Sequence, residues 1–210
     1  IESYLSEMSV KHDFLIIDEP DERQAAQKAV KLVKEGQARV LMKGLINSSD
    51  FMRAVLASDT GLTAGKRLSH LGAFEVPGQK KIIFFTDGGV NVAPSLLQKK
   101  DILIDALCAL EKIGILNPKV ALLSINEKVS PKIPSAVDAK ALADMRRAGV
   151  IPTGILEGPI AMDVAVSPEA ARHKGIKSNI SGDVDLFLVP NADAGNMIGK
   201  TLIHYAGAKM

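Results

Sequence analysis

Residues able to bind an anion gather in the segment 43–53. Asn47, Ser48 and Ser49 follow an apolar run, and Arg53 lies within two turns of them if a helix begins at Asn47. Hydroxyl groups, the N–H groups at the start of a helix and a guanidinium all bind anions. The segment therefore fits a site for phosphate or a similar anion. A capped helix with a solvated arginine explains the same residues equally well, and both interpretations stay open.

A second group of polar residues follows an apolar run at 82–86. Thr86 ends the run, and Asp87 and Asn91 flank the adjacent pair Gly88 and Gly89. Two neighbouring glycines permit close approach of the backbone to a ligand, but they are equally an ordinary turn. Asp87 and Asn91 are therefore candidate site residues, with a turn as the alternative.

A third group follows the apolar run 184–189, which is typical of a strand buried on both faces. Asn191, Gly195 and Asn196 form a polar loop, and a helical pattern follows. Strand, polar loop and helix together build ligand sites in α/β proteins. Residues 194–201 also resemble a relaxed Walker A loop, but Ala194 replaces its first glycine. The apolar residues after Asn196 suit a packed helix better than a phosphate cradle.

The remaining reactive residues carry weaker signals. Lys128 lies in a loop after a predicted strand at 119–124, where it either reaches a phosphate or is simply solvated. Cys108 lies among apolar residues of a predicted helix at 94–113, which predicts a buried, inert thiol. The four histidines and the single cysteine show no metal-ligand spacing, so we expect no metal site.

The elements that must position these groups alternate between strand and helix, which predicts an α/β fold with a parallel sheet. A polar connection at 61–66 marks the expected domain boundary. Residues 1–66 would be part of a first α/β domain and residues 67–200 a second, with 201–210 a helix end returning towards the first. We expect strands at 14–17, 40–42, 68–74, 82–86, 119–124, 154–157 and 184–189, and helices at 22–35, 94–113, 136–148 and 168–173 and after Asn191.

Composition narrows the function classes. The 210 residues carry a net charge of only +2, and aromatic residues make up 4%, so nothing favours binding to nucleic acid. No apolar run approaches the roughly 18 residues of a membrane helix. A single cysteine excludes an intrachain disulfide framework and indicates a reducing, cytoplasmic environment.

Four segments taken together resemble the phosphotransacylase family, the phosphate acetyl- and butyryltransferases, with the butyryl branch most similar. Their order along the chain matches the family, and they cover nearly all of it. They are residues 41–53 (LMKGLINSSDFMR), 85–94 (FTDGGVNVAP), 157–163 (EGPIAMD) and 189–196 (VPNADAGN). Lys200 then matches the lysine of the family's Ala-Gly-Asn-x-x-x-Lys helix, which replaces the Walker A interpretation.

The resemblance implies two α/β domains in the isocitrate dehydrogenase-like fold, with parallel-rich sheets, flanking helices and an active cleft between the domains, usually as a homodimer. It implies the reaction acyl-CoA plus phosphate to acyl phosphate plus CoA, with CoA as a substrate and no bound cofactor. Asn47, Ser48, Ser49 and Arg53 would then bind phosphate. The residues expected to line the cleft are Lys43, Thr86, Asp87, Asn91, Lys128, Asp163, Asn191, Gly195 and Asn196.

The sequence departs from the family at both ends. Family members are longer, and their Ser-Arg pair and following aspartate, assigned to thiol activation and charge stabilisation, would lie beyond Met210. The catalytic residues are therefore unknown, and we expect the chain to be a fragment. Two alternatives remain: an NAD(P)- and metal-dependent dehydrogenase of the same fold, for which Asp183, Asp185 and Asp193 are the available carboxylates, or a non-catalytic ligand-binding relative.

Overall fold

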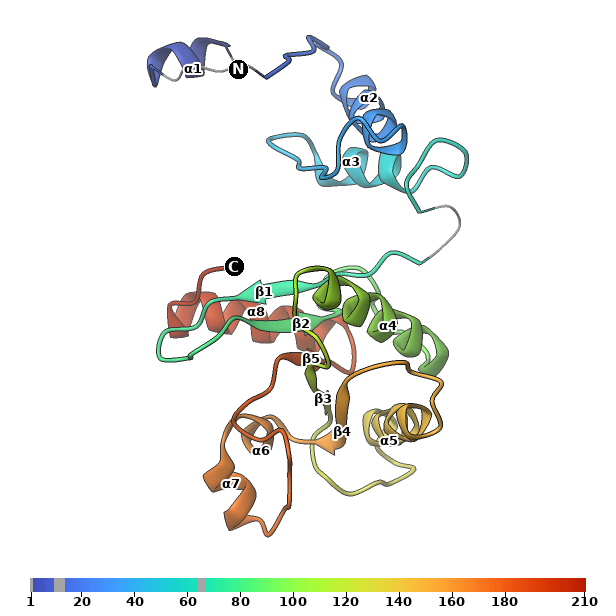
Figure 1. Ribbon diagram of the computed structural model, residues 1–210, viewed down its shortest axis with the longest axis vertical. Coiled ribbons are helices and arrows are strands. Elements are labelled where there is room, and N and C mark those ends of the chain that lie inside the picture. Colours follow the sequence, from blue (N-terminus) through green and yellow to red (C-terminus); the bar gives the residue numbers. More distant parts are fainter. Residues whose placement is uncertain (1, 10–13, 64–66) are drawn as a thin grey trace. The chain divides into compact units, whose positions relative to one another are not determined.

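The computed structural model describes residues 2–9, 14–63 and 67–210 (Figure 1). It divides into two compact units, Ile1–Lys66 and Arg67–Met210. The first unit has a small apolar cluster, and the second has one apolar cluster on each face of a sheet. The assignment of residues 1–66 to part of an α/β domain stays a prediction.

Helices form the regular structure of the first unit within its described residues. They are α1 (Glu2–Glu7), α2 (Glu22–Lys34) and α3 (Ser48–Val55). Helix α2 begins where the Asp21 carboxylate accepts a hydrogen bond from the Gln24 N–H at 2.8 Å. Ala26 and Val30 of α2 are buried against Ala54 and Val55 of α3. The apolar stripe predicted for residues 22–35 therefore packs α2 on α3.

Two strands predicted in this unit, at 14–17 and 40–42, are wrong. Both segments are irregular, and Leu15 and Met42 are 84% and 89% exposed. A strand requires a neighbour to pair its backbone N–H and C=O groups, and the described residues of this unit contain none. The apolar, partly β-branched composition of these two segments was therefore not sufficient to predict a strand.

The second unit is built on a five-stranded sheet with the order β1-β2-β5-β3-β4. Strand β1 pairs antiparallel with β2, and all other pairs are parallel. The predicted α/β class with a mostly parallel sheet is confirmed for this unit. The strands are β1 (Gly72–Phe74), β2 (Ile83–Thr86), β3 (Lys119–Leu123), β4 (Ile155–Ile160) and β5 (Leu186–Leu188).

Helices cover both faces of this sheet, with α4 and α5 on one side and α6, α7 and α8 on the other (Figure 1). Successive side chains of β2 point to opposite faces, so Phe84 packs towards α4 while Phe85 packs on the face of α8. Strand β5 alternates in the same way and is buried on both faces, as its sequence predicts. The helices are α4 (Leu96–Lys112), α5 (Pro134–Arg147), α6 (Met162–Val166), α7 (Pro168–His173) and α8 (Ala192–Ala206).

Cys108 is exposed, which corrects the expectation of a buried thiol. Helix α4 buries Ile102, Leu103, Ala106 and Leu107 on one stripe, and at about 100° per residue Cys108 falls on the opposite side. The expectation counted apolar neighbours in sequence, whereas burial follows the helical period.

The four parallel strands end at one edge of the sheet, and the polar loops after β2 and β5 begin there. The chain end also belongs to the second unit, and the expected return of residues 201–210 towards the first domain stays a prediction. At the chain end, Glu75 and Lys209 exchange backbone hydrogen bonds at 2.9 and 3.0 Å. Within the described residues, no helix has the length and apolar character needed to cross a membrane.

Candidate active site

The start of α3 is held by its own cap. The Asn47 side-chain oxygen accepts hydrogen bonds from the N–H and the hydroxyl of Ser49, both at 2.9 Å. This geometry fixes the turn that presents the first N–H groups of an eight-residue helix. Lys43 folds over the loop that leads into α3, where its Nζ donates to the carbonyls of Gly44 and Ile46, both at 3.3 Å.

Arg53 lies in the last turn of α3 and is paired within its own helix. Its Nη1 is 2.6 Å from Oδ1 of Asp50, and Nε of Arg23 from α2 reaches the same oxygen at 3.1 Å. The Arg53 side chain is nevertheless 65% exposed, so the guanidinium is open to solvent. The structure thus shows the features of a capped helix with a solvated arginine. If the segment is instead an anion site, the anion would have to compete with Asp50 for Arg53.

In the second unit, Asp87 organises the loop after β2. Its buried carboxylate accepts hydrogen bonds from the N–H groups of Gly89 (2.9 Å), Val90 (2.8 Å) and His70 (3.0 Å), and from Nδ2 of Asn91 (2.6 Å). Burial acts to raise the pKa of Asp87, but these donors outweigh it and hold the pKa below its ordinary value. Asp87 is therefore an ionised structural carboxylate with its acceptor positions occupied.

Asn91 and Thr86 extend this network to the segment before β1. Asn91 receives a hydrogen bond from Nη1 of Arg67 at 2.8 Å and donates to the carbonyl of Leu68 at 3.0 Å. The buried Thr86 hydroxyl donates to the carbonyl of His70 at 2.8 Å. The residues predicted at this loop are thus brought together, and what they do in the structure is position the backbone.

The loop after β2 and the start of α8 meet through glycines. A Cβ placed on Gly195 would lie 2.6 Å from Cα of Gly88, closer than real Cβ atoms approach. Asn191 immediately precedes helix α8, and its side-chain oxygen accepts a hydrogen bond from the N–H of Ala194 at 2.9 Å. Asn191 therefore acts as a cap, and the two glycines allow the backbones to touch.

A cavity of about 170 Å³ lies beside this contact and brings together predicted residues and one that the sequence did not single out. That residue is His70, whose Nδ1 is buried without a hydrogen-bond partner among the described residues. A titratable residue inside the predicted strand 68–74, whose other members apart from Ser69 are apolar or glycine, was the available signal. The cavity is lined by His70, Phe74, Phe85, Gly88, Gly89, Gly195, Asn196, Gly199, Lys200, Ile203 and Met210.

Of the residues predicted to line the cleft in this unit, Gly195 and Asn196 line this cavity, whereas Thr86, Asp87, Asn91, Asn191, Lys128 and Asp163 do not. Lys128 is exposed in the loop after β3. Asp163, in the first turn of α6, lies 2.8 Å from Nζ of Lys174, and this hydrogen bond lowers the pKa of Asp163. Both residues also follow carboxyl ends of strands, but the described cavity is built from β1, β2 and α8.

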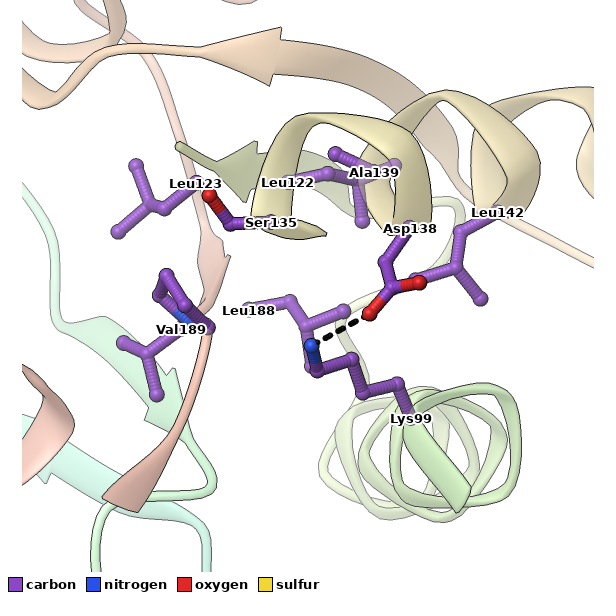
Figure 2. A pocket seen from close by; sticks show the side chains of 10 residues that line it. Lys99, Leu122, Leu123, Ser135, Asp138, Ala139, Leu142, Leu188 and Val189 are labelled. Atoms are coloured by element: carbon purple, nitrogen blue, oxygen red, sulfur yellow. Dashed lines mark hydrogen bonds and ion pairs between the residues drawn. The ribbon is translucent and has the colours of Figure 1, made fainter. Parts of the chain in front are cut away.

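A small hollow of about 10 Å³ lies at the carboxyl ends of β3 and β5, between α4 and α5. Figure 2 shows Lys99 of α4 and Asp138 of α5 pointing towards one another, with Nζ and Oδ2 2.7 Å apart. The Lys99 side chain is only 8% exposed. Lys99 lies three residues before Ile102 and therefore on the buried stripe of α4, so the helical spacing of the sequence predicts its burial. The hollow has room for about one water molecule, so it is a helix-joining contact and no ligand pocket.

Two of the three carboxylates considered for a dehydrogenase metal site, Asp183 and Asp185, pair with lysines, and the third, Asp193, is exposed in the first turn of α8. Asp183 and Asp185 lie at the opposite, amino-terminal end of β5, where Nζ of Lys81 is 2.6 Å from each. Lys119 also pairs with Asp183, and together these lysines lower the pKa of Asp183 to about 2. In the part of the chain that the structure describes, no three His, Cys, Asp or Glu residues are grouped to hold a metal ion.

A mostly parallel sheet covered by helices, with polar loops gathered at its carboxyl edge, defines an α/β protein of the kind that binds small ligands at that edge. The chain belongs to the phosphate acetyl/butyryl transferase family: the family model described as "Phosphate acetyl/butaryl transferase" matches residues 5–210.

Relatives within this family are similar along most of the chain. A phosphate butyryltransferase of Clostridium acetobutylicum is 42% identical over 198 residues, covering 94% of this chain and 66% of the relative. A phosphate acetyltransferase of Rhizobium meliloti is 44% identical over 187 residues, covering 89% of this chain and 59% of the relative. The chain therefore spans less than two thirds of the length of either relative.

A solved structure supports the fold. The crystal structure of a branched-chain phosphotransacylase from Enterococcus faecalis superposes with a TM-score of 0.83 at 36% sequence identity, covering 92% of this chain and 69% of that one. The dehydrogenase alternative loses support from this match and from the lysine pairing of Asp183 and Asp185.

Proposed function

We propose that the protein transfers a short acyl group between CoA and phosphate, converting acyl-CoA and phosphate to acyl phosphate and CoA, with a butyryl or branched-chain group preferred. Membership of the family over residues 5–210 carries this proposal. Similarity to a phosphate butyryltransferase and to a branched-chain phosphotransacylase motivates the preference for acyl groups longer than acetyl, and the 44% identity to a phosphate acetyltransferase makes acetyl the competing substrate to compare.

The chemistry asks the protein for anion binding and for a reactive thiolate of CoA. In the direction written, a phosphate oxygen attacks the acyl carbonyl and CoA leaves as the thiolate; in the reverse direction that thiolate attacks the acyl phosphate and phosphate leaves. No enzyme nucleophile is therefore required. The position of Cys108 on the outer side of α4 is consistent with that. Phosphate would be held by the N–H groups at the start of α3, by Ser48 and Ser49, and by Arg53 after it exchanges Asp50 for the phosphate oxygens.

The decisive experiment measures CoA release by the full-length protein from acyl-CoAs of two to five carbons, with and without phosphate. Phosphate-dependent release that is fastest with four- or five-carbon chains is expected. A protein that hydrolyses or binds acyl-CoA without any phosphate dependence would contradict the proposal and favour the non-catalytic relative.

Arg53 is tested with a matched control. Arg53→Ala should raise the KM for phosphate by about tenfold to a hundredfold, the range for one charge-assisted hydrogen-bonded contact of roughly 1.5–3 kcal/mol. Arg23→Ala removes the other guanidinium from the same Asp50 oxygen and should leave the phosphate KM within about twofold. Equal effects of the two substitutions would assign Arg53 to the stability of α3 instead.

We also propose a homodimer in the cytoplasm with the isocitrate dehydrogenase-like arrangement of two domains that the family resemblance implies. An apolar groove of about 470 Å³ between α6 and α8 supports self-association, because Met197 and Val166 there are 67% and 48% exposed. Light scattering should report a dimer that Met197→Glu converts to monomer; a monomeric wild type would contradict the dimer.

The single cysteine remains the argument for a reducing compartment.

A further inference from the structure

The cavity beside the Gly88–Gly195 contact combines an apolar wall with a polar rim. Phe74, Phe85 and Ile203 supply the wall, and His70, Asn196 and Lys200 supply the rim. The rings of Phe74 and Phe85 meet edge to face with centroids 5.6 Å apart, and Phe85 stacks on Phe187 at 4.6 Å. The wall is therefore made of rings that the core already holds in place.

His70 has its backbone fixed and one ring nitrogen unpaired. Its N–H donates to Asp87 and its carbonyl accepts from Thr86, at 3.0 and 2.8 Å. Its Nδ1, by contrast, is buried without a hydrogen-bond partner among the described residues. Buried polar atoms in folded proteins almost always have partners, so an unpaired one beside a cavity points to a ligand that supplies the missing bond.

The volume of the cavity is compatible with an acyl chain as that ligand. One water molecule needs about 10–15 Å³ on the measure that gives 170 Å³ here, so the cavity has room for a short alkyl chain. A butyryl group has four carbons and one carbonyl oxygen, and an acetyl group only two carbons and one oxygen, so the longer chain fills more of the cavity and covers more of its apolar wall. The apolar wall suits the alkyl chain, and the polar rim suits the carbonyl oxygen.

We propose that this cavity is the acyl-chain pocket, with the alkyl chain against Phe74, Phe85 and Ile203 and the carbonyl oxygen hydrogen-bonded by His70. The inference rests on the acyl transfer proposed above, because it assigns the part of the substrate that distinguishes one acyl-CoA from another. His70 in this position contacts the carbonyl that all acyl-CoAs share, and the residues of α8 determine acyl selectivity.

Gly199 of α8 provides a way to change the depth of the pocket. A Cβ added there would lie 3.2 Å from Cζ of Phe74, so a methyl group occupies space at the wall while alanine remains favourable in a helix. Ile203→Ala makes the opposite change by removing side-chain volume one turn further along α8. One methylene in an apolar pocket changes relative rates by about tenfold to two hundredfold.

The test measures kcat/KM of the full-length protein for acyl-CoAs of two to six carbons at saturating phosphate. Gly199→Ala should lower the ratio of butyryl to acetyl by about tenfold or more, and Ile203→Ala should shift the optimum to a longer chain. His70→Phe should lower kcat/KM for every acyl-CoA by about tenfold or more, with partial recovery in His70→Asn, which returns a polar atom near the position of Nδ1. His204→Phe, the same change at an exposed histidine of α8, should have little effect.

Calorimetric titration with butyryl-CoA and acetyl-CoA, without phosphate, separates this inference from the transferase proposal. Active wild type with an unchanged chain-length profile in both Gly199→Ala and Ile203→Ala would overturn the pocket and leave the transferase intact. No turnover, with butyryl-CoA binding that Gly199→Ala and His70→Phe weaken, would overturn the transferase and support the pocket. Neither turnover nor binding in the wild type would overturn both.

Discussion

Asp87 acts as the hub of the loop after β2, because one buried carboxylate accepts from three backbone N–H groups and Asn91. Asp87→Ala would leave these buried donors without an acceptor. We expect it to lower the free energy of unfolding by about 3 kcal/mol or more, measured by urea denaturation followed by circular dichroism. Asp193→Ala, at an exposed carboxylate of α8, should change it by about 0.5 kcal/mol at most; equal losses would contradict the role of Asp87.

The sequence identified Asp87 and Asn91 as site residues but not what they do. Their types and spacing were compatible with ligand contact or with a turn, and choosing between these required the positions of His70 and Leu68, about twenty residues earlier. His70 itself carries no motif, since an unpaired nitrogen is a property of packing. Residue type predicts which groups can do chemistry, and the fold decides which of them are already occupied.

At the scale of elements, the close packing of α8 against the loop after β2 depends on Gly195 having no side chain. Gly195→Ala would place a methyl group 2.6 Å from Cα of Gly88 and 2.9 Å from Cγ2 of Val189. Neither backbone nor buried side chain can yield easily, so a loss of about 1–3 kcal/mol is expected despite the better helix propensity of alanine. Lys200→Ala, one turn along at an exposed position, should be nearly neutral in the same thermal unfolding experiment.

Helices α4 and α5 are joined by the ion pair between Lys99 and Asp138. Lys99 is more deeply buried than Asp138, so removing one partner or the other should destabilise the protein by different amounts. Asp138→Ala leaves the 8% exposed Lys99 side chain without a counter-ion, whereas Lys99→Met leaves a 21% exposed carboxylate. We expect a loss of about 3 kcal/mol for the first and less for the second, with much of the first recovered in the double variant Lys99→Met/Asp138→Leu. Identical losses for both single variants would contradict this order.

At the scale of the whole molecule, acid should loosen the amino-terminal end of the sheet. The pKa of Asp183 is lowered from 3.8 to about 2 by Lys119 and Lys81, so its pairing contributes stability above about pH 4 and loses it as the pH falls towards 2. The Asp183 side chain is 56% exposed, which keeps this contribution modest. The difference in midpoint of thermal unfolding between wild type and Asp183→Asn should shrink over this window; a difference that is constant from pH 6 to pH 2 would contradict the pairing.

The sequence predicted the sheet of the second unit well and the strands of the first unit wrongly, for one physical reason. Runs such as Leu186–Leu188 are apolar because neighbours pair with them and helices cover both faces. The segments at 14–17 and 40–42 have similar composition but no partner among the described residues. Strand formation is a property of a pair, so single-segment composition predicts it only where the rest of the sheet is present.

The outward position of Cys108 has a practical meaning for the enzymology. Aromatic disulfide dyes, the usual chromogenic reporters of liberated CoA, react with any accessible sulfhydryl, and this protein offers one of its own on every chain. Mixing this 210-residue chain with dye should give a substrate-independent burst of one equivalent, after which only turnover adds colour. A serine in place of Cys108 would remove that burst, and Cys108 itself is an attachment point for a fluorophore on the exposed side of α4.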